Sequence, residues 1–92
     1  MEIKFFAHIR YYTGEKQTSW DAPVKDLSDL LKQLSLKYGN KFSEAVFNQD
    51  QTELSAFIMV LVNGRHVKDL NGIGTVLAPN DKISILPAAM GG

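Results

Sequence analysis

The amino-acid sequence predicts an α+β fold in which one main helix packs across a mixed β-sheet. Segments near both ends alternate like strands, whereas the stretch that follows residue 23 repeats its apolar residues at three- and four-residue steps. The 92 residues suffice for one hydrophobic core and leave no room for a second. A β-grasp topology, with the first and last strands parallel at the sheet centre, accounts for the order of hairpin, helix and strands. We expect residues 1–87 to form this domain and residues 88–92 to form an extended, flexible tail.

The N-terminal segment is predicted to form a β-hairpin. Residues 2–10 (EIKFFAHIR) place Ile3 and Phe5 on one parity with further apolar residues, which is typical of a half-buried strand. A turn at residues 13–16 would return the chain into a second strand over residues 17–20.

The next segment is predicted to form the main helix, over residues 24–38. Pro23 suits the entry to a helix, and Gly39 suits its C-terminal cap. One apolar stripe recurs at helical spacing and consists of Val24, Leu27, Leu30, Leu31, Leu34 and Tyr38.

The second half of the chain is predicted to supply the remaining strands. A short helical turn is expected around residues 43–47, then a central strand over residues 56–62 and a hairpin turn at residues 63–65. A short return strand is expected at residues 66–70, and the last strand at residues 82–87.

The loop between these last two strands carries two further predictions. Val76 and Leu77 are expected to anchor it to the core, and Asn80 is expected to adopt a left-handed conformation.

Composition excludes several classes of function. Ten basic and ten acidic residues give a net charge of zero, which argues against nucleic acid or an anionic membrane as the main partner. The chain has no cysteine, so it has neither disulfides nor a thiol nucleophile of its own, as suits the cytoplasm. Its longest apolar run, residues 56–62, is too short to span a bilayer. The first residues already show a strand pattern, so we expect no signal peptide.

Groups that could carry catalysis are scarce. His8 and His66 stand at no metal-ligand spacing, and no phosphate-binding loop motif is present. We therefore expect no metal, no cofactor and no stand-alone catalysis.

Apolar residues on the outward parity of the strands are more informative. If Ile58, Val60 and Val62 face the core, then Phe6, Met59 and Leu86 gather on the open face of the sheet. Such a cluster on a charged face favours a protein partner. The alternative is that the segment at residues 40–55 folds over part of it.

The sequence closes with PAAMGG, in which five residues after Pro87 are mostly small and uncharged. Extended, they would reach roughly 17 Å, and glycine would let the walls of a partner's channel approach the backbone closely. The terminal carboxylate becomes a good acyl donor once ATP converts it to an acyl-adenylate. Because this chain has no ATP-binding motif, a separate enzyme would have to activate it.

Several stretches together resemble a known family. In chain order they are IKFFAHIRYYTG, PVKDLSDLLKQL, VLVNGRHV, VLAPNDKISILP and the terminal GG, which together make up half of the chain. They resemble the small subunit of molybdopterin synthase, a β-grasp sulfur carrier of the ubiquitin-like superfamily.

The resemblance implies a cycle of activation and delivery. An E1-like adenylyltransferase would adenylate Gly92, with Gly91 as its required neighbour, and the carboxylate would become a thiocarboxylate. The tail would then enter the large subunit of molybdopterin synthase and donate sulfur to a pterin precursor. Residues implied to contact these partners are Phe6, Met59, Leu86, Pro87 and Met90.

Some positions depart from the family pattern and leave the acceptor open. The usual tail has two prolines and then a bulky aliphatic residue, whereas this chain has Pro87 followed by two alanines and Met90. Asn80 replaces a common glycine. Archaeal-type relatives are instead conjugated to lysines or supply sulfur for tRNA thiolation. A third hypothesis is a plain interaction domain with an inert tail.

Overall fold

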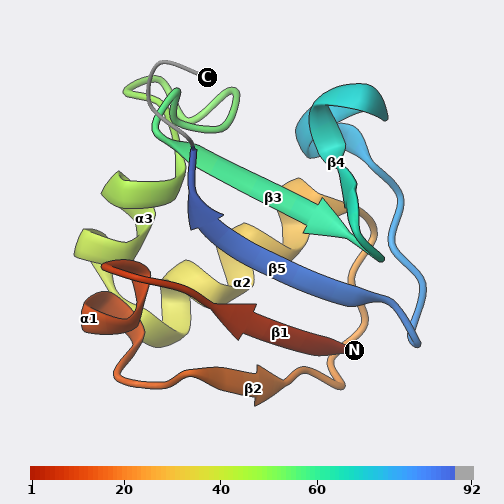
Figure 1. Ribbon diagram of the computed structural model, residues 1–92, viewed down its shortest axis with the longest axis horizontal. Helices are drawn as coiled ribbons and strands as arrows, with labels where there is room; N and C mark the ends of the chain where they lie inside the picture. The colour runs from red at the N-terminus through yellow and green to blue at the C-terminus, as the bar shows by residue number, and fades with distance from the viewer. Residues whose placement is uncertain (89–92) are drawn as a thin grey trace.

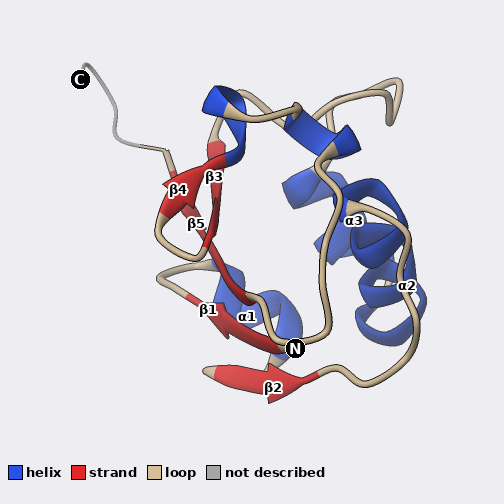
Figure 2. Cartoon of the chain, turned by 90° about the vertical axis from the view of Figure 1, so that its right-hand side faces the viewer, coloured by secondary structure: helices blue, strands red, loops and turns tan. Residues whose placement is uncertain are grey.

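The computed structural model describes residues 1–88 as one five-stranded sheet with helices on one face (Figures 1 and 2). The strands are β1 (Glu2–Phe5), β2 (Gln17–Ser19), β3 (Ile58–Val62), β4 (Arg65–His66) and β5 (Lys82–Pro87). The helices are α1 (Ile9–Thr13), α2 (Leu27–Tyr38) and α3 (Asn40–Val46), with 3-10 turns η1 (Val67–Asp69) and η2 (Gly72–Gly74).

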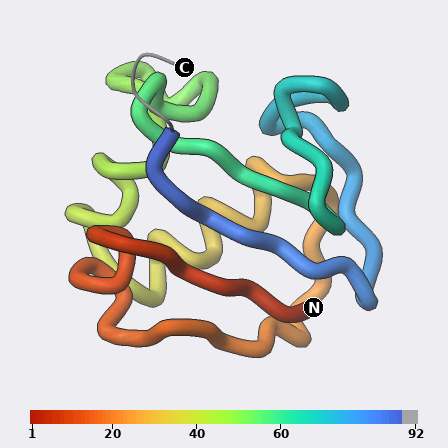
Figure 3. Tube along the Cα trace, in the orientation of Figure 1, coloured from red at the N-terminus to blue at the C-terminus, as the bar shows by residue number. Residues whose placement is uncertain are grey.

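The strand order confirms the predicted β-grasp topology. The sheet runs β2-β1-β5-β3-β4, and β1 pairs in parallel with β5 while the other neighbours are antiparallel. The first and last strands therefore lie side by side although some 80 residues separate them in the chain (Figure 3). The parallel pair is possible because α2 and the later strands supply the long crossover that such a pair requires.

The core lies between the sheet and α2. The helix contributes Leu27, Leu30, Leu31 and Leu34, each with no exposed surface. The sheet contributes the alternate residues of its central strands, which include Ile3, Phe5, Val60, Ile83 and Ile85.

Helix α2 begins at Leu27, three residues later than predicted. The Asp26 carboxylate caps it there by accepting a hydrogen bond from the Asp29 N–H at 2.9 Å. Val24 packs against the core from outside the helix.

The first strand is shorter than predicted, and this is a correction. β1 ends at Phe5, and the segment that was expected to continue it forms α1 instead. Ile9 and Thr13 are both buried, four residues apart, so they lie on one face of a helix. Ile9 happens to fit both a two-residue and a helical period, which is why the alternation in residues 2–10 misleads.

The chain changes direction between β1 and α1 at Ala7, whose φ is +52°. A residue with a Cβ atom pays about 1–2 kcal/mol in this left-handed region. We expect Ala7→Gly to stabilise the fold by up to about 1 kcal/mol, because the gain is partly offset by the greater entropy of glycine in the unfolded chain. Urea unfolding would measure the change. Ala22→Gly is the matched control at an exposed residue whose φ is not positive, and an equal gain there would contradict this reason.

Three local predictions in the second half are also corrected. The return strand β4 has only two residues and then passes into η1. Val76 is 75% exposed, so only Leu77 of the two predicted anchors is buried. The positive φ belongs not to Asn80 but to Asn63, which with Gly64 turns the chain between β3 and β4. Asn63 also donates to Asp81 and accepts from the Lys82 N–H, and these bonds tie the turn to the start of β5.

The C-terminal end of α2 is linked to the loop before β2. The Tyr38 hydroxyl donates a hydrogen bond to Glu15, and the Lys37 ammonium lies 3.8 Å from the same carboxylate. Burial raises the pKa of Tyr38 to about 12, and the hydrogen bond to Glu15 contributes to the rise.

This shift predicts a loss of stability at alkaline pH. The unfolded chain releases the Tyr38 proton near pH 10, whereas the folded chain holds it until about pH 12. The contribution is therefore complete below pH 10 and is lost as the pH rises through 12. We expect Tyr38→Phe to flatten the fall in unfolding free energy over this interval, measured by urea unfolding at a series of pH values. An unchanged slope would contradict the assignment.

Candidate functional site

Three apolar side chains form one row across the three central strands of the sheet. Met59 and Leu86 are directly paired between β3 and β5, so their side chains lie on the same face. Phe6 follows β1, and its N–H still donates to the Ile85 carbonyl at 3.0 Å, which places it beside Leu86. We call Phe6, Leu86 and Met59 the apolar row.

The apolar row lies on the sheet face opposite the helices, as the alternation of the sequence predicted. Ile58, Val60 and Val62 of β3 are buried, whereas the intervening Met59 is half-buried. Leu86 is likewise half-buried, and Phe6 is 36% exposed. That the apolar row binds a partner stays a prediction.

Further along the strands this face is polar on β1 and β5, whereas β3 adds one more apolar residue, the half-buried Leu61, which is paired with Ser84. Two residues further along the strands, Lys4 and Ser84 are paired, and beyond them Glu2 is paired with Lys82. The apolar row therefore lies at the end of the sheet at which β5 finishes, and Leu61 adds apolar surface beside it on β3. Arg10 of α1 borders it, because its guanidinium carbon lies 5.9 Å from the centre of the Phe6 ring while its Nε donates to the Phe5 carbonyl at 2.9 Å.

The segment at residues 40–55 does not cover the apolar row. It forms α3 and the following loop, and α3 packs against α1 and α2 on the helical side of the sheet (Figure 2). Within residues 1–88 this removes the alternative in which that segment would shield the row.

The root of the tail is held next to this face. The Ala88 N–H donates to the Phe57 carbonyl at 2.9 Å, which extends the pairing of β5 with β3 by one residue. The Phe57 N–H in turn donates to the Ser55 hydroxyl at 3.1 Å. The predicted contact residue Pro87 is paired with Ile58, which is buried on the helical side, so Pro87 shares that side rather than the open face.

Phe57 is the residue at this end that sequence reasoning missed. It is 64% exposed although both of its backbone groups are hydrogen-bonded. Its parity with Met59 in the apolar run at residues 56–62 was the available signal. Among the residues that were predicted to form the site, Met90, Gly91 and Gly92 lie outside the described residues.

Residues 1–88 contain no group of three or more His, Asp or Glu side chains that could hold a metal ion. None of the helices in this part of the chain is both long and apolar enough to cross a membrane.

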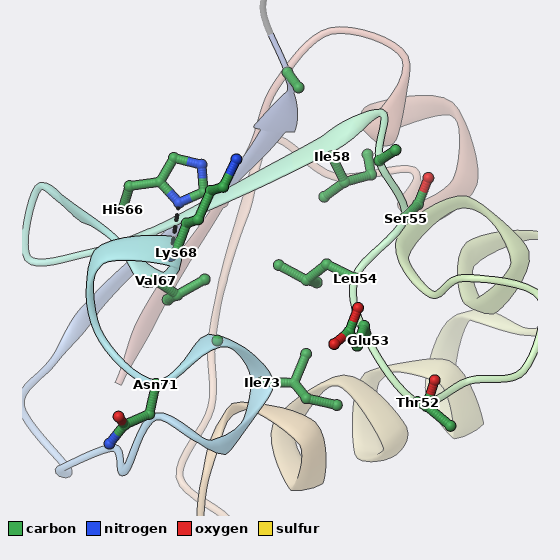
Figure 4. A pocket seen from close by; sticks show the side chains of 13 residues that line it. Thr52, Glu53, Leu54, Ser55, Ile58, His66, Val67, Lys68, Asn71 and Ile73 are labelled. Atoms are coloured by element: carbon green, nitrogen blue, oxygen red, sulfur yellow. Dashed lines mark hydrogen bonds between the residues drawn. The ribbon is translucent and has the colours of Figure 1, made fainter.

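A pocket of about 540 Å³ opens at the same end of the molecule, beside the tail root (Figure 4). One wall is the loop at residues 52–56, and the other is the segment that runs from His66 through η1 and η2 to Ile73. Strand β3 contributes Ile58, and β5 leads into Ala88 at the rim of the pocket. Figure 4 shows Leu54, Val67 and Ile73 pointing toward the middle of the pocket.

The β-grasp sheet and the helices on one of its faces define a ubiquitin-like protein. A model of the ThiS family matches residues 3–92, and the chain belongs to this ubiquitin-like family of sulfur carriers.

Individual relatives agree with the family. Small archaeal modifier protein 3 of Haloferax volcanii is 32% identical over 96 aligned residues, which cover 100% of this chain and 98% of that protein. Sulfur carrier protein CysO of Mycobacterium tuberculosis is 29% identical over 84 residues, 91% of this chain and 89% of that protein. The solution structure of small archaeal modifier protein 1 from Methanosarcina acetivorans has a TM-score of 0.78 and 30% identity, and the match covers 99% of this chain and 94% of that chain.

Proposed function

We propose that this protein carries sulfur on its C-terminal glycine, as a thiocarboxylate made from an acyl-adenylate. The observation that carries the proposal is the position of the apolar row and of Ala88 at the same end of the sheet, from which the sequence continues to Gly91 and Gly92. A partner that binds the row can receive the tail in the same complex. The family match, which extends to residue 92, supports the assignment of the last glycine as the reactive end.

The proposed chemistry divides between this chain and other proteins. The Gly92 carboxylate attacks the α-phosphate of ATP on an E1-like adenylyltransferase, and pyrophosphate leaves. Hydrosulfide then attacks the acyl carbon and displaces AMP, which gives the thiocarboxylate directly. If the donor is a persulfide, its outer sulfur displaces AMP to give an acyl disulfide, and a thiol then reduces this bond, so that the thiocarboxylate and a disulfide are released. This chain contributes the acyl group and the docking face, and the partner contributes the catalytic side chains.

For the acceptor, we propose a pterin precursor bound to the large subunit of molybdopterin synthase. The ordered set of stretches that resemble the small subunit of that enzyme supports this acceptor. In this role the protein is a sulfur-donating subunit with no stand-alone activity.

A second candidate is a protein modifier joined through Gly92 to substrate lysines, or a sulfur donor for tRNA thiolation. Full-length similarity to small archaeal modifier protein 3 favours this candidate, because the alignment covers both chains almost completely. Both candidates use the same activation step and differ in the nucleophile that accepts the product.

Intact-mass measurement tests the shared step. The purified chain is incubated with ATP, the cognate activating enzyme and a sulfur donor. We expect a gain equal to the replacement of one oxygen atom by sulfur, and the gain should vanish when ATP is omitted. No such product with an activating enzyme that demonstrably binds the chain would refute the sulfur-carrier proposal.

The two acceptors are separated by the fate of the thiocarboxylate. Mixed with the large subunit and pterin precursor, the carrier should return to its original mass as the precursor gains sulfur. In cell extracts, a modifier should instead accumulate in larger adducts that contain an isopeptide bond to lysine. Adducts without sulfur transfer to the precursor would replace the first acceptor by the second.

A further inference from the structure

The pocket beside the tail root has no part in the proposed cycle, yet it has the features of a binding site. Its volume of about 540 Å³ lies in the range of pockets that hold small ligands or short peptide segments. Its walls are apolar at Leu54, Ile58, Val67 and Ile73, while polar groups stand around them (Figure 4). This combination suits a peptide segment in which an apolar side chain and a charged group lie a few residues apart.

We propose that this pocket binds the C-terminal segment of the same chain, residues 89–92. In the bound form the Met90 side chain lies among the apolar walls, and the Gly92 carboxylate lies beside the Lys68 ammonium. The family resemblance implies that Met90 contacts a partner, so a Met90 side chain held in the pocket would not be available for that contact.

The length and composition of the segment permit this. Ala88 lines the pocket, so the segment starts at its rim. Four further residues span at most about 14 Å, which restricts the segment to surfaces near Ala88, such as this pocket. Residues 88–90 contain no proline, so no ring fixes their φ angles against a reversal of the chain. Methionine is unbranched and suits a pocket of irregular shape.

The charges around the pocket fit a carboxylate on one side. Within residues 1–88, the ion pair with a nitrogen–oxygen distance of 4.0 Å or less is that of Lys37 with Glu15. Lys68 therefore has no carboxylate oxygen within this distance in the described part of the chain. Glu53 belongs to the opposite wall and would repel the carboxylate toward Lys68.

His66 can assist on the same side. Its Nδ1 accepts a hydrogen bond from the Lys68 N–H at 2.9 Å, so the neutral ring carries its proton on Nε2. The ring therefore offers a donor to a carboxylate while its other nitrogen holds the Lys68 backbone in place.

Occupation of the pocket would compete with activation. A segment that lies in the pocket cannot enter the channel of an activating enzyme at the same time, so the pocket holds back the reactive end until a partner displaces it. This consequence depends on the proposed function, whereas occupation of the pocket does not.

The experiment uses the full chain alone, with methyl-labelled Met, Leu, Ile and Val. We expect nuclear Overhauser effects between the Met90 methyl group and the methyl groups of Leu54 and Ile73, and none to Leu36, which is exposed on α2. Met90→Ala should shift the resonances of the pocket residues, and Lys68→Ala should weaken the Met90 contacts while Lys32→Ala leaves them unchanged. A folded chain that shows no Met90 contacts, or contacts that Lys68→Ala does not weaken, would overturn the proposal.

A second measurement reports the consequence for activation. Lys68→Ala should raise the rate of ATP–pyrophosphate exchange with the activating enzyme about twofold or more, as expected when a segment is released from a state it occupies at least half of the time. A chain with Met90 contacts but no exchange activity at all would refute the sulfur-carrier proposal and leave the occupied pocket standing. Contacts with an exchange rate that Lys68→Ala does not raise would overturn the competition.

Discussion

A chain that lacks Gly91 and Gly92 is expected to unfold at the same temperature as the full chain and to form no thiocarboxylate. The fold should be unaffected because the core and the hydrogen bonds of the sheet are complete within residues 1–88. The chemistry should be lost completely, because the shortened end cannot place its carboxylate at the nucleotide. Thermal unfolding and intact-mass measurement, made on the same preparation, check both expectations.

A variant of unchanged length separates reach from backbone shape. In the double variant Gly91→Ala, Gly92→Ala, the carboxylate keeps its distance from Ala88, but two methyl groups are added where the channel walls would approach the backbone. We expect it to bind the activating enzyme and to be adenylated at least about tenfold more slowly, which corresponds to roughly 1.4 kcal/mol in the barrier. Normal activity of the shortened chain would exclude the carrier function.

Two neighbouring residues of β5 are expected to show opposite effects. Ile85 has no exposed surface and faces α2, whereas Leu86 is half-buried on the open face. Ile85→Ala should cost about 2–5 kcal/mol of unfolding free energy, because it leaves a cavity in the core. Leu86→Ala should cost much less stability but weaken binding to the activating enzyme about tenfold or more, as expected for a central contact of an interface.

Unfolding curves and isothermal titration calorimetry would measure the two effects on both variants. Ile85→Val serves if Ile85→Ala fails to fold, with an expected cost of about 0.5–1.5 kcal/mol and unchanged affinity. Phe6→Ala should behave like Leu86→Ala, since the two side chains share the apolar row. A large stability loss in Leu86→Ala with unchanged affinity would show that the row serves the fold rather than a partner.

Much of the fold could be predicted from the sequence. The stripe of leucines in α2, the apolar alternation of β3 and β5 and the Asn63–Gly64 turn each follow from a local period or a local preference of the backbone. The same alternation correctly predicts that Met59 and Leu86 lie on the outward face, although it does not predict that they are paired with each other.

Two of the wrong predictions, for residues 6–10 and for Val76, arise because contacts between distant parts of the chain decide the structure there. Residues 2–10 satisfy the period of a strand, but Ile9 is buried by packing of α1 against α3 and the sheet, so distant residues decide between strand and helix there. The exposed Val76 lies where the loop forms an isolated antiparallel backbone bridge with Asp26, far earlier in the chain. The late start of α2 has a local cause instead, because the Asp26 cap acts on Asp29 only three residues further on. The contacts that bury Ile9 and place Val76 join distant parts of the chain and cannot be read from sequence neighbours, whereas the Asp26 cap could have been.

The class of fold and the two faces of the sheet follow from the sequence alone, because both depend on local periodicity, and the terminal glycine pair is read directly from it. By contrast, the apolar row, the Ala88–Phe57 hydrogen bond and the pocket with Lys68 meet at one end of the molecule only because of how the chain folds. Parallel pairing of β1 with β5 brings residues from both ends of the chain together, and the register of that pairing is set by burial of Ile3, Phe5, Ile83 and Ile85 against α2. Because this register is a property of the whole core, the sequence pattern of each strand alone does not reveal it.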